Sequence, residues 1–139
     1  MKKKKILFAT GTNSPSACDK VAIMRMRISE LFKNNIRFTP IIKTTPIGIV
    51  SQDFSNCVGI AYTDLPFEKI NEEFKKIEFE CGDTYDKRRK NLVEMDIDIL
   101  EYDGIRYHEK DWGRGYIIDM IKQTCILENE ILNGKQIIL

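Results

Sequence analysis

One ten-residue segment near the middle of the chain restricts the fold more than any other. In FSNCVGIAYT, residues 54–63, larger side chains alternate with small ones. Successive strand residues point to opposite faces of a sheet, so the small side chains of Cys57, Gly59 and Ala61 share one face. The opposite face carries Phe54, Asn56, Val58, Ile60 and Tyr62. The pattern predicts a central strand with a helix packed close against its small face.

Further runs of apolar and β-branched residues predict the other strands. These runs are residues 5–10, 36–45, 92–102 and 105–108. Pro40 lies inside the second run, and because proline has no N–H to donate, this strand is expected at a sheet edge or a bulge. A tight turn at Asp103 and Gly104 joins the last two runs into a hairpin.

Apolar residues spaced three and four apart predict two amphipathic helices. The first has Ser14 or Ser16 as its N-cap and ends near residues 33–35. The second is capped by Asp64 and stops at Gly82. The expected buried stripes are Val21, Met24, Ile28, Leu31 and Phe32 in the first helix, and Phe67, Ile70, Phe74, Ile77 and Cys81 in the second.

The order of these elements predicts the fold class. It is β-α-β-β-α-β, followed by a hairpin strand and a short helix that begins after Gly113, while residues 83–91 read as a polar loop. This order is typical of an α+β, ferredoxin-like split βαβ fold, in which two helices cover one face of a mainly antiparallel sheet. The 139 residues suit a single domain, 1–139. The other face is expected to be open and to carry any binding site.

Composition excludes several classes of protein. Twenty-two basic and twenty-one acidic residues leave a net charge of +1, which provides no overall field for nucleic acid or a membrane. The opening MKKKKILFAT has too short an apolar run for a signal peptide, and no run approaches membrane-spanning length. Four scattered cysteines and one histidine argue against a zinc site. We therefore expect a cytoplasmic protein with reduced cysteines.

Two aspartates in VEMDIDIL, residues 93–100, are the strongest candidates for chemistry. Asp96 and Asp98 share one strand face, while Met95, Ile97 and Ile99 share the other. Neighbouring carboxylates repel each other, and aspartate is disfavoured in strands. Mg²⁺ would offset this repulsion, since it prefers carboxylate, phosphate and water oxygens. The alternative is a solvated edge strand that happens to carry two acids.

Other segments offer possible contacts to a planar, phosphorylated ligand. Phe54 and Asn56 share a face that suits a heterocycle, although Phe54 could equally belong to the core. Gly11 could let a flat ligand approach the backbone or could simply form a turn. The basic run KRRK, residues 87–90, could clamp phosphates or be a solvated loop. His108 could bind phosphate or serve as an acid, and Arg114 could also reach a phosphate.

The order of these motifs carries more information than any one of them. ATGTN, KTTPIG, FSNCV, KIEFECG, MDIDIL and HEKDWGRGY follow one another over residues 5–118. This arrangement resembles the 6-hydroxymethyl-7,8-dihydropterin pyrophosphokinase family of folate biosynthesis. The resemblance implies a ferredoxin-like fold and transfer of diphosphate from ATP to the hydroxymethyl group, with release of AMP. The implied partners are ATP, a dihydropterin and two Mg²⁺ ions, in a monomer or weak homo-oligomer without nucleic acid or membrane.

The resemblance also implies roles for individual residues. Asp96 and Asp98 correspond to the metal-binding and catalytic pair. His108 and Arg114 correspond to catalytic contacts to the triphosphate, and Glu78 to a nucleoside contact. The implied pterin-binding positions are Gly11, Thr44, Ile47, Phe54, Asn56 and Tyr116.

The chain departs from the family pattern at two arginines that clamp the triphosphate. The family usually has Gly-Arg where this chain has Gly82 and Asp83, and Arg-Thr-Leu where it has VEM, residues 93–95. Arg88 or Arg89 could supply the missing nucleotide contact. One alternative is a relative that binds pterin or nucleotide with little transfer. Another is an RNA-binding or regulatory ferredoxin-like module, which two acids on the open sheet disfavour.

Overall fold

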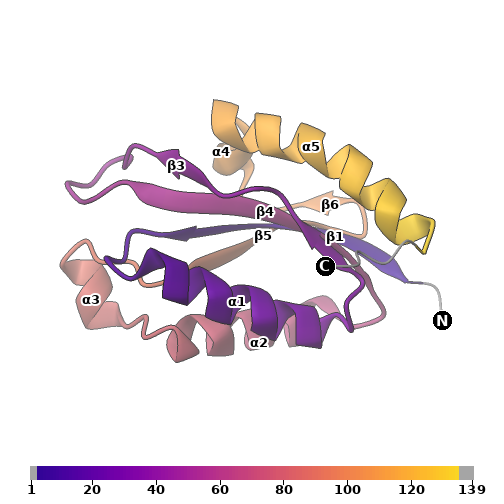
Figure 1. Cartoon of the computed structure of the whole chain (residues 1–139), viewed down its shortest axis with the longest axis horizontal. Helices are drawn as coiled ribbons and strands as arrows, with labels where there is room; N and C mark the ends of the chain where they lie inside the picture. The colour runs from indigo at the N-terminus through magenta and orange to yellow at the C-terminus, as the bar shows by residue number, and fades with distance from the viewer. Residues whose placement is uncertain (1–2, 135–139) are drawn as a thin grey trace.

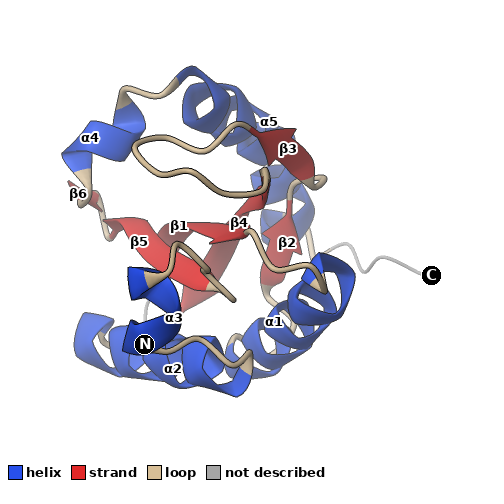
Figure 2. Ribbon diagram, turned by 90° about the vertical axis from the view of Figure 1, so that its left-hand side faces the viewer, coloured by secondary structure: helices blue, strands red, loops and turns tan. Residues whose placement is uncertain are grey.

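A computed structural model of the chain describes residues 3–134, in which one six-stranded sheet lies between two layers of helices (Figures 1 and 2). The strands are β1 (Lys4–Thr12), β2 (Ile36–Phe38), β3 (Ile42–Thr44), β4 (Phe54–Thr63), β5 (Asp96–Tyr102) and β6 (Ile105–Arg106). The helices are α1 (Ala17–Leu31), α2 (Phe67–Glu80), α3 (Tyr85–Arg89), α4 (Glu109–Trp112) and α5 (Gly115–Leu132). Within the described residues, none of the helices combines the length and hydrophobicity needed to span a bilayer.

The sheet confirms the expected α+β class and its mainly antiparallel pairing. Its order is β2-β4-β1-β5-β6, β3 also pairs with β4, and all five pairings are antiparallel. The strand expected over residues 36–45 is interrupted at Pro40, so β2 and β3 lie separately along one edge. Between them Thr39 pairs with Val58 through its backbone N–H (2.8 Å) and its hydroxyl, which accepts from the Val58 N–H at 2.9 Å.

The small face of β4 packs against α1 and α2, as its alternation predicts. The Phe8 ring lies directly over Gly59, where an added Cβ would come within 2.2 Å of the ring. Phe8 also lies 5.1 Å from Phe74 and 6.2 Å from Phe32, measured between ring centroids. These contacts make Gly59 necessary, because any side chain there would displace the largest residue of the core.

The opposite face is not open, and this expectation was wrong. Helix α5 is 18 residues long, well beyond the short helix expected, and covers one end of that face (Figure 1). Its Ile117 and Met120 pack with sheet residues in a second core of buried residues, completed by Leu7, Val58, Ile60 and Leu100. Only the end of the face beyond α5 is left for a site.

Two of the expected connections are also corrected. Helix α2 begins after Pro66 rather than being capped by Asp64, and the Thr63 hydroxyl accepts the Leu65 N–H instead. Gly82 does end this helix, with φ of +93°. The polar loop expected over residues 83–91 contains α3, because the Thr84 hydroxyl accepts the Lys87 N–H and caps a short helical turn.

Candidate functional site

A pocket of about 180 Å³ opens on the sheet face beyond α5. Nine of the residues predicted for the site line it: Gly11, Thr44, Ile47, Phe54, Asn56, Asp96, Asp98, Arg114 and Tyr116. The other lining residues are Ala9, Thr10, Thr45, Ile49, Val93, Asp111 and Ile117. The pocket therefore brings together segments that span more than one hundred positions of the sequence.

One end of the pocket is flat and mostly uncharged. Gly11 of β1 lies opposite Asn56 of β4, and a Cβ added to Gly11 would stand 2.9 Å from the Asn56 Oδ1 and 3.6 Å from the Phe54 ring. The Asn56 amide donates to the Thr44 hydroxyl at 2.5 Å. A fixed amide beside an aromatic ring, with a glycine that keeps the surface flat, suits a planar heterocycle.

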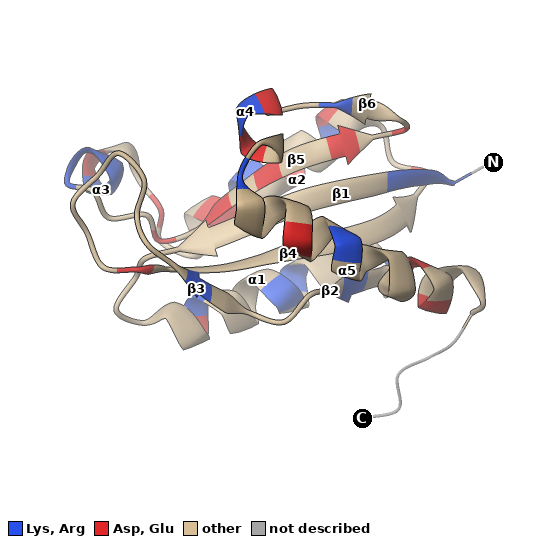
Figure 3. Cartoon of the chain, turned by 90° about the horizontal axis from the view of Figure 1, so that it is seen from above, with Lys and Arg blue, Asp and Glu red and all other residues tan. Residues whose placement is uncertain are grey.

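The other end of the pocket contains the two aspartates of β5. Asp98 lies opposite Ala9 and Asp96 opposite Gly11, so small residues flank both acids. Burial raises the pKa of Asp98 to about 8, and the neighbouring charge of Asp96 adds to this shift. The acids are therefore held where a cation would stabilise them strongly. Figure 3 shows acidic positions along β5 and basic positions on α3 and beside α4.

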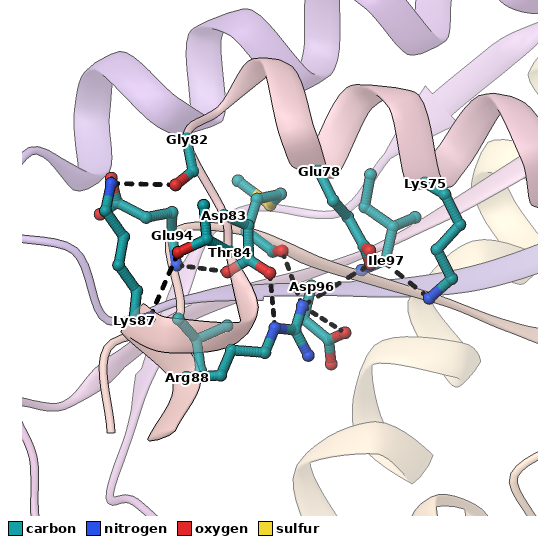
Figure 4. A network of polar contacts seen from close by, with 12 residues as sticks. Lys75, Glu78, Gly82, Asp83, Thr84, Lys87, Arg88, Glu94, Asp96 and Ile97 are labelled. Atoms are coloured by element: carbon teal, nitrogen blue, oxygen red, sulfur yellow. Dashed lines mark hydrogen bonds and ion pairs between the residues drawn. The ribbon is translucent and has the colours of Figure 1, made fainter. Parts of the chain in front are cut away.

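Arg88 is the basic residue of α3 that reaches this end (Figure 4). Its Nη2 donates to the Asp96 Oδ1 at 3.3 Å and to the Met95 carbonyl at 3.1 Å. Its Nε donates to the Asp83 Oδ2 at 2.5 Å. Arg89 lies against the Tyr85 ring, 5.8 Å from its centroid. Of the two arginines expected as substitutes, the structure thus brings Arg88 beside the aspartates and turns Arg89 to the exposed side of α3.

Asp111 is a pocket residue that sequence reasoning missed. Its Oδ1 lies 3.2 Å from the Arg114 Nη1. The Nε2 of His108 lies 3.8 Å from the Asp98 Oδ1, and Asp98, His108 and Asp111 have ligand-type atoms within 4.8 Å of one another. An acid three residues before an arginine in HEKDWGRGY allows such a pair on a helical turn, but here the two residues lie on either side of the turn between α4 and α5.

Trp112 and Tyr116 fix the segment that carries these residues. The Trp112 indole N–H donates to the carbonyls of Leu100 and Tyr107, each at 3.1 Å, which ties α4 to the sheet. A hydrogen bond with the Tyr116 side chain is the main contact that raises the pKa of Arg114, and Asp111 adds to the effect. Arg114 is therefore held at the pocket in its charged form.

Glu78, the expected nucleoside contact, lies beneath β5 and does not line the pocket. It is 5% exposed, and its Oε2 accepts the Ile97 N–H at 2.8 Å while its Oε1 lies 3.4 Å from the Lys75 Nζ. Burial raises the pKa of its carboxyl. Both oxygens are thus engaged inside the fold, where they brace α2 against β5.

The donor set of the charged end fits Mg²⁺. Two carboxylates on a rigid strand offer hard oxygen ligands and leave the remaining positions to phosphate and water. Of these two carboxylates, Arg88 contacts only that of Asp96. It therefore offsets their mutual repulsion only in part. A divalent cation would complete the compensation.

Comparison with known proteins identifies one family. The family model described as 7,8-dihydro-6-hydroxymethylpterin-pyrophosphokinase (HPPK) matches residues 7–127 of the 139. A search of curated protein sequences returned no significant match. The matched range includes every residue that lines the pocket.

Proposed function

Because the chain belongs to the 7,8-dihydro-6-hydroxymethylpterin-pyrophosphokinase family, it is a diphosphotransferase of folate biosynthesis that uses Mg-ATP and a pterin, and we propose that its pocket is where the transfer occurs. The observation that carries this proposal is the convergence of nine predicted residues on one cavity. They come from four strands, the loop after β3 and the start of α5, and no local feature of the chain requires them to meet.

The flat end of the pocket is the pterin site in this proposal. Asn56 can both donate to and accept from the edge of the ring, and its hydrogen bond to Thr44 fixes the amide. Phe54 and Tyr116 provide the aromatic surfaces, and Ile47 of the loop after β3 provides an apolar one. Gly11 keeps the backbone flat beneath the ring.

The charged end binds the triphosphate and metal. Asp96 and Asp98 would hold two Mg²⁺ ions, which when bound would neutralise the triphosphate and align the hydroxymethyl oxygen with the β-phosphorus. The hydroxymethyl oxygen forms the new bond to the β-phosphorus and loses its proton to solvent. The bond between the β-phosphorus and the α,β-bridging oxygen breaks, and AMP leaves with that oxygen and the bonding electron pair. Arg114, Arg88 and His108 bind the phosphate oxygens, which places the transferred group between the aspartates and the pterin.

A second candidate is a family member that binds both substrates but transfers diphosphate poorly. Asp83 and Val93 stand where the family pattern has arginines. Arg88 is already within ion-pair distance of three acids. AMP formation from ATP, Mg²⁺ and 6-hydroxymethyl-7,8-dihydropterin separates the candidates. We expect AMP to form at a rate that depends on both aspartates. Tight binding of both substrates without AMP at high enzyme concentration would instead support the second candidate.

The remaining features of the proposal concern the whole chain. We propose a single domain over residues 1–139, since one sheet connects the described elements and both helical layers pack on it. The pocket is built within one chain, which supports function as a monomer or weak homo-oligomer. The use of ATP supports a cytoplasmic location.

A further inference from the structure

Arg88 is anchored independently of its contact with Asp96. Its Nε is held by the Asp83 Oδ2, and the other oxygen of Asp83 accepts the Glu94 N–H at 2.9 Å. The Glu94 Oε2 in turn forms an ion pair with the Lys87 Nζ at 3.2 Å. Asp83 therefore links α3 to the chain just before β5, and this link would persist if Arg88 released Asp96 (Figure 4).

Of the contacts that Arg88 makes, its hydrogen bond to Asp96 is the one that a ligand could most readily replace. At 3.3 Å it is the longest of the three hydrogen bonds made by the guanidinium. The side chains of Arg88 and Asp96 are 36% and 34% exposed, whereas that of Asp83 is 8% exposed. Asp96 lines the pocket, and Arg88 borders the pocket through this contact. A ligand bound at Asp96 would therefore meet the guanidinium on the side away from the buried Asp83 carboxylate.

A divalent cation and Arg88 compete for Asp96. A cation bound to the Asp96 carboxylate would stand close to the Nη2 group, and like charges at such a separation repel. A phosphate bound to the same cation would reverse the balance, because it supplies new acceptors for the guanidinium. Arg88 thus opposes binding of the metal alone and favours binding of the metal together with a phosphate.

We infer that Arg88 is an exchangeable counter-ion: it neutralises Asp96 until metal and nucleotide bind together, and then transfers its Nη2 group from the carboxylate to a phosphate while Asp83 keeps its Nε in place. This inference rests on the proposed function, since it requires nucleotide at the same site. It gives Arg88 a phosphate-binding role, which Asp83 makes possible because its carboxylate holds the Arg88 Nε in place.

The test measures two affinities on the full chain. Mn²⁺ alone is titrated by electron paramagnetic resonance, and α,β-methylene ATP with excess Mg²⁺ is titrated by calorimetry. Arg88→Gln removes the charge but keeps a donor. It should bind Mn²⁺ alone about tenfold more tightly and the Mg²⁺–nucleotide about tenfold more weakly than wild type. Arg89→Gln, one residue away and on the exposed side of α3 against the Tyr85 ring, is the matched control and should change neither affinity by more than about twofold.

The opposite changes in the two affinities distinguish an Arg88 that moves from Asp96 to a phosphate from one that only holds α3 in place. If Arg88→Gln weakens both affinities, Arg88 only braces α3 and the inference fails; it also fails if Mn²⁺ binding is unchanged. Arg88→Lys restores a cation and should return Mn²⁺ affinity to within about twofold of wild type. The proposed function is judged separately by AMP formation in the wild-type protein.

A measurement on the unsubstituted protein keeps the inference testable if Arg88→Gln does not fold. Side-chain ¹⁵N spectra of arginine, with Arg88→Lys used for assignment, follow the guanidinium directly. Addition of Mg²⁺ with α,β-methylene ATP should shift the Arg88 Nη signals more than its Nε signal. If the Arg88 Nη and Nε signals stay unchanged while the nucleotide binds, the inference is wrong.

Discussion

The sheet face on the side of α5 has a covered end and a pocket end, which are built by the same three strands but have opposite chemistry. Under the helix the strands present apolar side chains, and the residue four positions further along each strand lines the pocket. The corresponding pairs are Leu7 and Gly11 on β1, Ile60 and Asn56 on β4, and Leu100 and Asp96 on β5. One end buries apolar surface and the other exposes a glycine, an amide and an acid.

This difference separates stability from function along a continuous sheet. The covered end gains free energy from burial, at roughly 25 cal/mol per Å² of apolar surface. The pocket end carries acids whose burial and mutual repulsion oppose folding, as the raised pKa of Asp98 indicates. Substitutions at the two ends should therefore affect different measurements.

Asp98→Ala should have the largest effect, and on activity only. Loss of one carboxylate from the metal-binding pair removes several kcal/mol of transition-state stabilisation, so AMP formation should fall by at least about 10³-fold. The melting temperature should not fall, because the removed group is disfavoured by burial and by Asp96. Rates of AMP release and thermal melts test both parts. Activity within tenfold of wild type would exclude Asp98 from the reaction.

Ile60→Ala at the covered end should show the reverse. Ile60 is fully buried in the core beneath α5, and truncation of such a side chain costs about 2–5 kcal/mol. Urea unfolding should show this loss, while kcat/KM of the folded fraction stays within about threefold of wild type. A large loss of activity at temperatures where the variant is folded would mean that the two ends are coupled.

The fold was largely predictable because its strongest signals are local. The alternation in residues 54–63 gives the bounds of β4, and Gly59 is explained by a single contact with Phe8. The extent of α5 was not predictable in the same way. Residues such as Leu127 and Ile131 belong to a helix because they pack on a sheet formed far earlier in the sequence.

The site was predictable where strand register places its residues. Alternation alone puts Asp96 and Asp98 on one face, and family order relates them to Phe54 and Asn56. The choice between Arg88 and Arg89 was not predictable, because it depends on the helical phase of α3. Asp111 was missed for a similar reason: its approach to Arg114 arises from the turn between α4 and α5.

Gly11→Ala should affect the two substrates unequally. The added Cβ would stand 2.9 Å from the Asn56 Oδ1, so the amide must move away from its contact with Thr44. We expect KM for the pterin to rise about tenfold and KM for ATP to change by less than about threefold. Gly115→Ala is the matched control, because a Cβ at Gly115 meets nothing within 4 Å. Equal increases in both KM values would argue against separate pterin and phosphate ends.

The last expected effect is a dependence of stability on pH to which Asp98, at the pocket end, contributes. The pKa of Asp98 is raised from its usual 3.8 to about 8 in the folded protein, so between these values the folded state binds a proton that the unfolded state has lost. Stability therefore falls as pH rises through this range and levels off above it.

Without divalent cations, Asp98→Asn should flatten this part of the curve of stability against pH, whereas Ile60→Ala should lower the whole curve without changing its slope. Urea unfolding of the three proteins between pH 5 and pH 8, at about half-unit steps, provides the comparison. Added Mg²⁺ should reduce the wild-type slope, because a cation favours the ionised carboxylate. If wild type and Asp98→Asn instead run parallel, Asp98 is ionised throughout the range, and the repulsion between the two aspartates is already compensated within the protein.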